Sequence, residues 1–210
     1  MTIQVKVYTD FVCPYCFLAE APLLAATKDK DVTIEWMPFE LRPYPEETLK
    51  PEEDYLQRAW QESVRPLAQK MGVEIILPDV SPQPHTHLAH EGLLYSKKHN
   101  KEKEYTHRVF ASFFQEGKDI GQINVLREIA EEIGLDGESF EKALVAREFS
   151  EAREECLRQA FEEMQITAVP TMFVGERVLK GLHPQPNIER ALRGAIRDEK
   201  MEFCEGDECE

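Results

Sequence analysis

A strand pattern that runs directly into a helix pattern is the feature that most limits how this chain can fold. Ile3, Val5 and Val7 alternate with polar residues, as the residues of a half-buried strand do. The next apolar-periodic stretch begins at Cys13, and residues 31–39, DVTIEWMPF, alternate again. A strand, one short helix and a second strand are typical of a parallel βαβ unit. The sequence therefore predicts a parallel pair of strands near the amino terminus.

The middle of the chain has the periodicity of helices. After the segment RPYPEE the apolar spacing changes from two to about 3.6 residues. A helical stripe that begins at Tyr55 is expected to be kinked or divided at Pro66 and closed by Gly72. The pattern therefore predicts that residues 44–148 form an all-helical insertion. Its further helices are expected at 88–98, at 105–114, from an Asn124 N-cap to Gly134, and around 140–145.

The last third of the chain returns to strands. Ser150 is expected to cap a long helix, and residues 171–181, TMFVGERVLKG, have the pattern of two short strands around a Gly-Glu turn. The last helix is expected at residues 187–198. The order βαβ, helical insertion, αββα predicts an α/β protein with a thioredoxin-like fold and a central mixed sheet. The predicted domains are 1–43 plus 149–199 (thioredoxin-like), 44–148 (helical insertion) and 200–210 (acidic tail).

Composition and charge narrow the classes of function. A chain of 210 residues with 42% hydrophobic content can bury a real core without disulfides. Forty acidic against 25 basic residues give a formal net charge of -15, which disfavours phosphate-rich and anionic lipid surfaces. Nucleic acid and membrane are therefore not expected as partners. The sequence shows neither a signal-peptide pattern nor a membrane-length apolar run, so a cytoplasmic protein is expected.

Two of the five cysteines, Cys13 and Cys16, are separated only by Pro14 and Tyr15. In a reducing compartment structural disulfides are rare, and closely spaced cysteines are more often catalytic or metal-binding. If the helix begins here, Cys13 lies at or near the N-cap, Pro14 at the first helical position and Cys16 in the first turn. The Cys13 sulfur could then accept hydrogen bonds from free N–H groups, which favour a thiolate. Cys13 is therefore predicted to attack and Cys16 to be shielded, while Pro14 and Tyr15 set the redox poise.

Four stretches match a known family: DFVCPYCFLAE, PFELRP, HTHLAHEGLL and ITAVPTMFVGERVLKGLHP. Over about residues 3–198 the chain resembles the DsbA-like thioredoxin-fold oxidoreductases, and more closely their FrnE-like cytoplasmic branch. The resemblance implies that Cys13 attacks, Cys16 resolves and Pro170 is a cis-proline that faces them. It also implies that the Val169 backbone pairs with an extended substrate and that Thr171 adds contacts. The implied function is oxidation, reduction or isomerisation of disulfides, acting on protein or small-molecule thiols and disulfides without a cofactor.

Two other functions remain open. A glutathione-using relative, a kappa-class transferase or a 2-hydroxychromene-2-carboxylate isomerase, shares the fold. That branch has serine at the first motif position, so Cys13 argues against it. Outside catalysis, the chain could be a thiol metal-binding or redox-responsive interaction module that uses Cys13, Cys16, Cys204 and Cys209. The sequence predicts neither an oligomeric state nor the direction of the redox chemistry.

The carboxyl-terminal segment FCEGDECE contains Cys204 and Cys209, separated by a turn-prone Gly-Asp pair. Surrounding carboxylates disfavour a thiolate, so both cysteines are expected to be slower nucleophiles than Cys13. Three interpretations stay open: an inert tail, half of a zinc site, or an auxiliary redox dithiol that exchanges with the main one.

Several other residues bear on the site. The pattern His85, His87, His90 could suggest a metal site, but helix capping and packing are favoured, so no metal is expected. Glu40 could relay a proton to Cys16 if it were buried nearby, although a surface or helix-pairing role is favoured. Cys156 is expected to be an inert buried thiol, His183 a surface loop residue, and the aromatic residues of 105–114 part of the core of the insertion.

Overall fold

The computed structural model describes residues 2–206, and the side chains of residues 2–198. Its strands form one mixed sheet in the order β2-β1-β3-β4. β1 (Ile3–Thr9) pairs in parallel with β2 (Val32–Pro38). β3 (Thr171–Val174) is antiparallel to β1, and β4 (Arg177–Lys180) is antiparallel to β3. The predicted parallel pair, the predicted hairpin and the mixed α/β sheet are confirmed.

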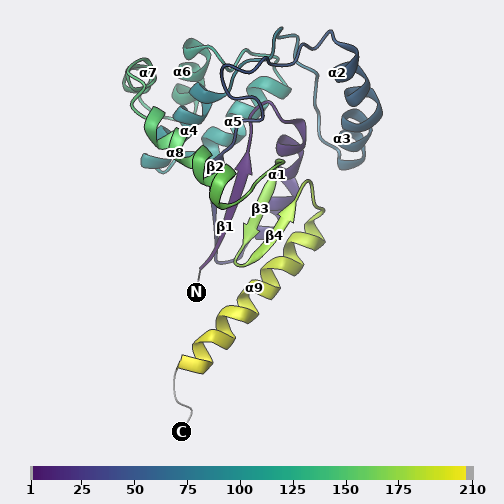
Figure 1. The fold of residues 1–210 in the computed structure, drawn as a ribbon, viewed down its shortest axis with the longest axis vertical. Coiled ribbons are helices and arrows are strands. Elements are labelled where there is room, and N and C mark those ends of the chain that lie inside the picture. Colours follow the sequence, from purple (N-terminus) through teal and green to yellow (C-terminus); the bar gives the residue numbers. More distant parts are fainter. Residues whose placement is uncertain (1, 207–210) are drawn as a thin grey trace.

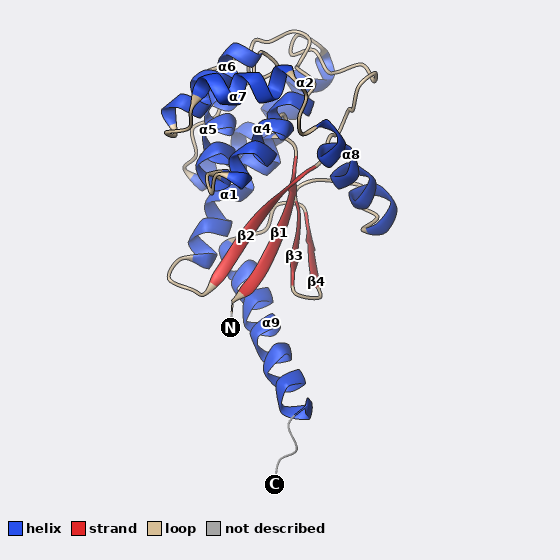
Figure 2. Cartoon of the chain, turned by 90° about the vertical axis from the view of Figure 1, so that its left-hand side faces the viewer, coloured by secondary structure: helices blue, strands red, loops and turns tan. Residues whose placement is uncertain are grey.

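Two helices accompany the sheet. α1 (Pro14–Thr27) crosses over from β1 to β2, and α9 (Gln185–Gly206) packs against α1 and contacts β1, β3 and β4. α9 continues past the predicted end at residue 198, because the segment up to Gly206 contains no helix breaker. In Figure 1 the carboxyl ends of β1 and β2 point toward the remaining helices, whereas α9 leads away from them. Figure 2 shows the strands as a single layer beneath these helices.

Residues 44–148, all of which the structure describes, consist of helices and loops, as predicted. The helix that was predicted to be kinked or divided at Pro66 contains a π-helical turn, which ends at Val64, and α3 begins at the next residue. Gly72 closes α3 with a φ of 67°. The division of the chain into separate domains stays a prediction, and buried residues from both parts form one continuous core. The helices are α2 (Asp54–Ala59), the π-helix Trp60–Val64, α3 (Arg65–Met71), α4 (His87–Lys98), α5 (Glu102–Phe114), α6 (Ile123–Glu132) and α7 (Gly137–Val145).

The aromatic residues of α5 lie in this core, as predicted. Phe110 and Phe114 are fully buried. Phe17 of α1 stacks on Phe114 with 5.6 Å between ring centroids, and Phe11 contacts Phe110 at 5.2 Å. Aromatic contacts of this kind therefore join the insertion to the segment that carries the two motif cysteines.

Some helix boundaries and apolar faces differ from the prediction. α6 begins at Ile123 after Gln122, so Asn124 is not its N-cap. Ser150 is the first residue of α8 (Ser150–Arg158) rather than its cap, and a π-helical turn (Gln159–Glu163) follows. Neither helix start has a side-chain capping hydrogen bond. Tyr55 and Phe161 are 61% and 45% exposed, so these predicted apolar faces are only partly covered.

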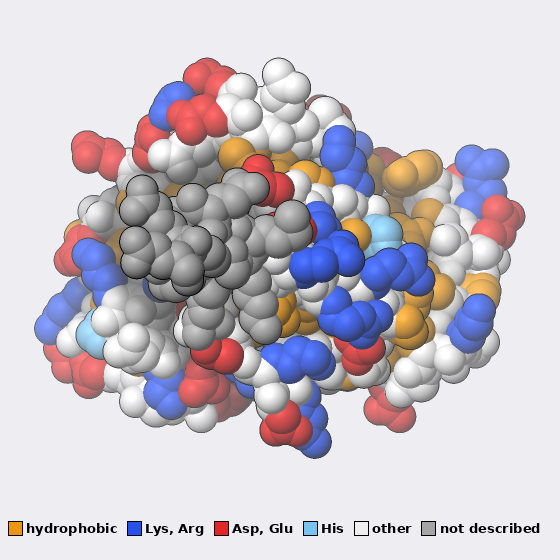
Figure 3. All heavy atoms as spheres, turned by 90° about the horizontal axis from the view of Figure 1, so that it is seen from below, with side chains coloured by type: hydrophobic (Ala, Val, Ile, Leu, Met, Phe, Trp, Pro, Cys, Tyr) orange, Lys and Arg blue, Asp and Glu red, His pale blue; other side chains and the backbone are white. Residues whose placement is uncertain are grey.

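The acidic excess is not uniform over the surface. Figure 3 shows lysine and arginine side chains gathered on the face seen from below, with apolar side chains between them. Among the helices that the structure describes, none combines the length and the apolar character that crossing a bilayer requires.

Candidate active site

Cys13 lies where the first strand gives way to the first helix. It is the N-cap of α1, in an extended conformation with φ of -90° and ψ of 112°, and Pro14 occupies the first helical position. Pro14 suits this position because its fixed φ is helical and its missing N–H would have no partner in the first turn. The N–H of Cys13 donates to the carbonyl of Asp10 at 3.0 Å, which closes the turn after β1. The predicted placement of the motif at a helix start is confirmed.

The Cys13 thiol faces the loop before β3. The Val169–Pro170 bond is cis, as the family resemblance implied, and the Cys13 thiol donates to the Val169 carbonyl with 3.6 Å between Sγ and O. We expected the sulfur to accept from helix N–H groups, but no side-chain capping bond is formed. A protonated thiol is itself a donor, so the carbonyl is the better partner. Thr171 is buried, and its hydroxyl donates to the Ala168 carbonyl at 2.7 Å.

Cys16 lies one turn inside the helix and is 1% exposed. Burial raises the pKa of the Cys16 thiol well above its usual range, and its hydrogen bond and charge interaction with Cys13 raise the pKa further. The Thr9 side chain and the Asp10 backbone act in the opposite direction. Cys13 and Cys16 are both free thiols here. Cys16 is therefore shielded as predicted, and only groups inside the protein can reach it.

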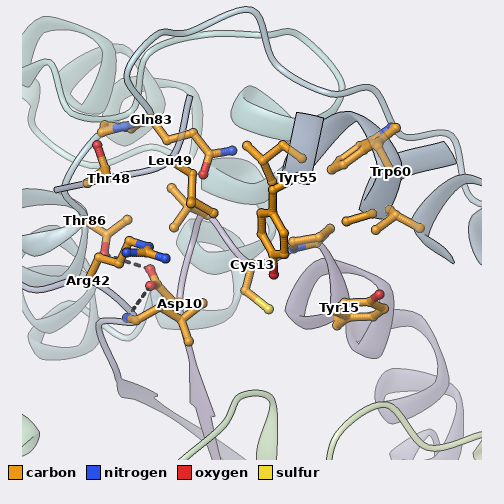
Figure 4. Close-up of a pocket in the computed structure, with 17 residues that line it drawn as sticks. Asp10, Cys13, Tyr15, Arg42, Thr48, Leu49, Tyr55, Trp60, Gln83 and Thr86 are labelled. Carbon is orange, nitrogen blue, oxygen red and sulfur yellow. Dashed lines mark hydrogen bonds between the residues drawn. The ribbon is translucent and has the colours of Figure 1, made fainter. Parts of the chain in front are cut away.

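Asp10 anchors this region to the insertion, a role that the sequence analysis did not assign. Its buried carboxylate accepts from the Leu41 N–H at 2.8 Å and from the Thr86 hydroxyl at 2.7 Å (Figure 4). His90 Nε2 lies 3.7 Å from the same carboxylate and donates to the Phe39 carbonyl at 3.0 Å. The only signal in the sequence was a carboxylate at the end of an apolar strand, three residues before Cys13.

A cavity of about 210 Å³ lies beside Cys13. It is bounded by the start of α1, by α2 with the π-helix after it, and by loop segments 41–49 and 83–86. Tyr55 projects over it from α2, which explains why this residue is exposed and not part of the core (Figure 4). Pro14 and Tyr15 also line the cavity, and the Tyr15 hydroxyl is 2.7 Å from the Ser63 hydroxyl. The substrate-binding roles of Pro14, Tyr15, Val169 and Thr171 stay predictions.

Glu40 is buried, and it is not among the groups that shift the pKa of Cys16. It forms an ion pair with Arg153 of α8, which also lies 3.4 Å from Glu91. The ion pair agrees with the favoured helix-pairing role of Glu40 and does not support a proton relay from Glu40 to Cys16. A half-buried thiol, Cys156, lies on the same helix, and burial raises its pKa.

The histidines that the sequence brought together bind different partners. His85 Nε2 donates to the Glu46 carbonyl at 2.9 Å, whereas His90 bonds to the Phe39 carbonyl. Burial, with Arg147 and Arg153 nearby, lowers the pKa of His87 to about 4. Within residues 2–198, no group of three histidine, cysteine or carboxylate side chains is placed to hold a metal ion.

The remaining predicted residues are His183 and the two carboxyl-terminal cysteines. His183 Nε2 donates to the Lys180 carbonyl at 3.1 Å, a local contact in the loop after β4. Cys204 and Cys209 lie outside the residues whose side chains the structure describes, so the auxiliary dithiol stays a prediction.

Comparisons with known proteins agree with this geometry. The family of DSBA-like thioredoxin domains matches residues 4–193. The uncharacterized protein YwbO of Bacillus subtilis (strain 168) is 49% identical over 193 residues, which are 91% of this chain and 96% of YwbO. A 2-hydroxychromene-2-carboxylate isomerase structure has a TM-score of 0.76 at 22% identity, covering 94% of this chain and 98% of that chain. The cytosolic disulfide reductase DsbM from Pseudomonas aeruginosa, solved with GSH, has a TM-score of 0.65 at 17% identity, with the same coverage of both chains.

Proposed function

This chain belongs to the family of DSBA-like thioredoxin domains, and we propose that it is a cytoplasmic thiol-disulfide oxidoreductase that acts through Cys13 and Cys16. The observation that carries the proposal is the position of Cys13 at the start of α1, with its sulfur 3.6 Å from the Val169 carbonyl and Cys16 buried behind it. A cytosolic disulfide reductase shares this fold, which supports a cytoplasmic location and disulfides as the substrate class.

The proposed reaction is thiol-disulfide exchange in two steps. The Cys13 thiolate attacks one sulfur of a substrate disulfide, a Cys13–substrate disulfide forms, and the other substrate sulfur leaves with the electron pair and takes a proton. Cys16 then loses its proton and attacks the Cys13 sulfur, which releases the second substrate thiol and leaves a Cys13–Cys16 disulfide. Run backward, the same steps oxidise a substrate dithiol. The direction depends on the reduction potentials of the two pairs.

The surroundings suit different roles for the two sulfurs. Cys13 is at a helix amino terminus, where negative charge is stabilised, and it lines the cavity, so a substrate can approach it. The pKa of Cys16 is raised by burial, which keeps its sulfur protonated until the first exchange has taken place. Cys16 is therefore suited to attack only the mixed disulfide next to it.

The test compares single serine variants in a disulfide reduction assay. Cys13→Ser should abolish the reaction because no sulfur is left in the cavity, whereas Cys16→Ser should still attack and should trap the substrate as a mixed disulfide on Cys13. Cys156→Ser, which changes a thiol outside the site, is the matched control and should behave as the unmodified protein. Equal and partial activity in the first two variants would contradict these roles.

A glutathione-dependent isomerase is the second candidate, favoured by the similarity to 2-hydroxychromene-2-carboxylate isomerase and by the cavity beside Cys13. That branch has serine at the first motif position, so Cys13→Ser should retain glutathione-dependent turnover of 2-hydroxychromene-2-carboxylate if this function applies. If disulfide exchange is the function, the same variant loses its activity.

A further inference from the structure

Gln83 faces the cavity beside Cys13 with an amide that makes no side-chain hydrogen bond to the described residues. Gln83 is 7% exposed, and Figure 4 shows its side chain directed into the cavity between Leu49 and Tyr55. Its backbone N–H donates to the Leu49 carbonyl at 2.8 Å, but within the described residues its side-chain amide makes no hydrogen bond. The amide is therefore open to the cavity, where it can pair with a ligand that offers both a donor and an acceptor.

The rest of the cavity is mainly apolar. Leu49, Tyr55 and Trp60 are among the side chains that surround it. Its volume of about 210 Å³ exceeds the roughly 150 Å³ of a protein cavity that binds benzene, so it has room for one aromatic ring and little more. The size and the lining therefore favour a single aromatic group close to the sulfur that Cys13 attacks.

The charged groups around the cavity disfavour a cationic occupant. The carboxylate of Asp10 is already engaged by the Leu41 N–H and the Thr86 hydroxyl. Arg42 is exposed, donates to the Glu47 carbonyl at 3.2 Å and, within the described residues, has no ion pair. Asp10 is fully buried whereas Arg42 is exposed, so the charge that an occupant of the cavity meets first is positive, and a neutral or acidic peptide fits it better than a basic one.

We propose that this cavity selects peptide disulfides in which an aromatic side chain flanks the reacting cysteine. The aromatic ring occupies the apolar part of the cavity, and the Gln83 amide pairs with the C=O and N–H of the adjoining peptide backbone. The inference rests on the proposed function, because it concerns the substrate that Cys13 attacks. No further reactant is needed: Cys13 bonds to the half-cystine next to the ring, and the other half-cystine leaves as a thiol after taking a proton.

The experiment measures the second-order rate at which the reduced Cys16→Ser variant is trapped by symmetric peptide disulfides, followed by mass spectrometry. The disulfides are those of Ac-Phe-Cys-Phe-amide and Ac-Gly-Cys-Gly-amide, together with 2-hydroxyethyl disulfide, and each rate is divided by that of dithiothreitol with the same disulfide. The Phe peptide should react about tenfold faster than the Gly peptide, a ratio that corresponds to about 1.4 kcal/mol and to partial burial of one ring.

Two variants, each made in the Cys16→Ser background, locate this preference. Ala59 lines the cavity from α2, so Ala59→Phe should fill it and bring the Phe-to-Gly ratio close to one. Ala152→Phe places the same ring on the exposed surface of α8 and should keep the ratio. Gln83→Leu should slow both peptides by about fivefold or more, which is the range for two lost hydrogen bonds, but should not slow 2-hydroxyethyl disulfide, which has no amide.

The outcomes separate the inference from the proposed function. If no disulfide traps the Cys16→Ser variant, the proposed function is wrong and the inference is wrong with it. If all disulfides react but the normalised Phe-to-Gly ratio stays near one, or if Ala59→Phe leaves a high ratio unchanged, exchange chemistry stands and the aromatic site is refuted. Oxidised glutathione serves as an added comparison, and a rate above that of the Phe peptide would also refute an aromatic preference.

Discussion

Replacing Asp10 by alanine is expected to weaken the attachment of the insertion to the sheet. The Asp10 carboxylate is buried at the end of β1 and accepts hydrogen bonds from two segments far away in the sequence, through the Leu41 N–H at 2.8 Å and the Thr86 hydroxyl at 2.7 Å. The alanine variant loses both bonds and leaves the buried Thr86 hydroxyl and the Leu41 N–H without this partner.

The expected loss of stability can be worked from these contacts. A hydrogen bond to a charged group contributes about 1.5 to 3 kcal/mol, and removing the carboxylate also relieves the cost of burying its charge. A net loss of about 3 kcal/mol is therefore expected, which is a large part of a typical total of about 5 to 15 kcal/mol. For a chain of this size it corresponds to a fall in Tm of about 6 to 12 °C.

Urea unfolding at neutral pH measures this loss, and a double-mutant cycle with Thr86→Val isolates one of the two bonds. The coupling energy between Asp10 and Thr86 should be about 1.5 kcal/mol or more. Asp79→Ala, which removes an exposed carboxylate, is the matched control and should change the free energy of unfolding by less than about 0.5 kcal/mol. A coupling energy near zero, or equal effects of Asp10→Ala and Asp79→Ala, would refute the argument.

Three further predictions concern stability. Arg153→Leu leaves Glu40 as a buried charge without its partner, so the free energy of unfolding in urea should fall by about 3 to 5 kcal/mol. Arg158→Leu removes exposed ion pairs on the same helix and should lower it by less than about 1 kcal/mol. Gly92→Ala places a Cβ 2.7 to 2.8 Å from ring carbons of two buried aromatic side chains, so the melting temperature should fall by the equivalent of at least about 1 to 3 kcal/mol. The pKa of His87 is about 4 when folded and near 6.5 when unfolded, so the unfolded chain takes up the proton first and stability should fall as the pH drops from 6.5 to 4. His87→Gln should flatten that part of a pH–stability curve, and an unchanged slope would count against a depressed pKa.

Much of the local structure could be predicted because it depends on residues that are close together in the sequence. The alternation of Ile3, Val5 and Val7 predicts β1, and Pro14 after Cys13 predicts the start of α1. The cis form of the Val169–Pro170 bond came from the family resemblance rather than from the residues alone. Helix starts were less well predicted: the predicted caps of α6 and α8 were wrong, since the N-caps are Gln122 and Phe149 and neither side chain forms a capping hydrogen bond.

The sequence by itself determined the order of strands and helices, and it placed Cys13 and Cys16 at the start of a helix, because these features follow from periodicity and from neighbouring residues. Only the tertiary structure decided which distant groups meet. Asp10 is joined to Thr86 across 76 positions and Glu40 to Arg153 across 113, and the amide of Gln83 is directed into the cavity beside Cys13. Each of these contacts depends on how segments far apart in the sequence pack together, and a polar residue in a sequence does not reveal which buried partner that packing will bring to it.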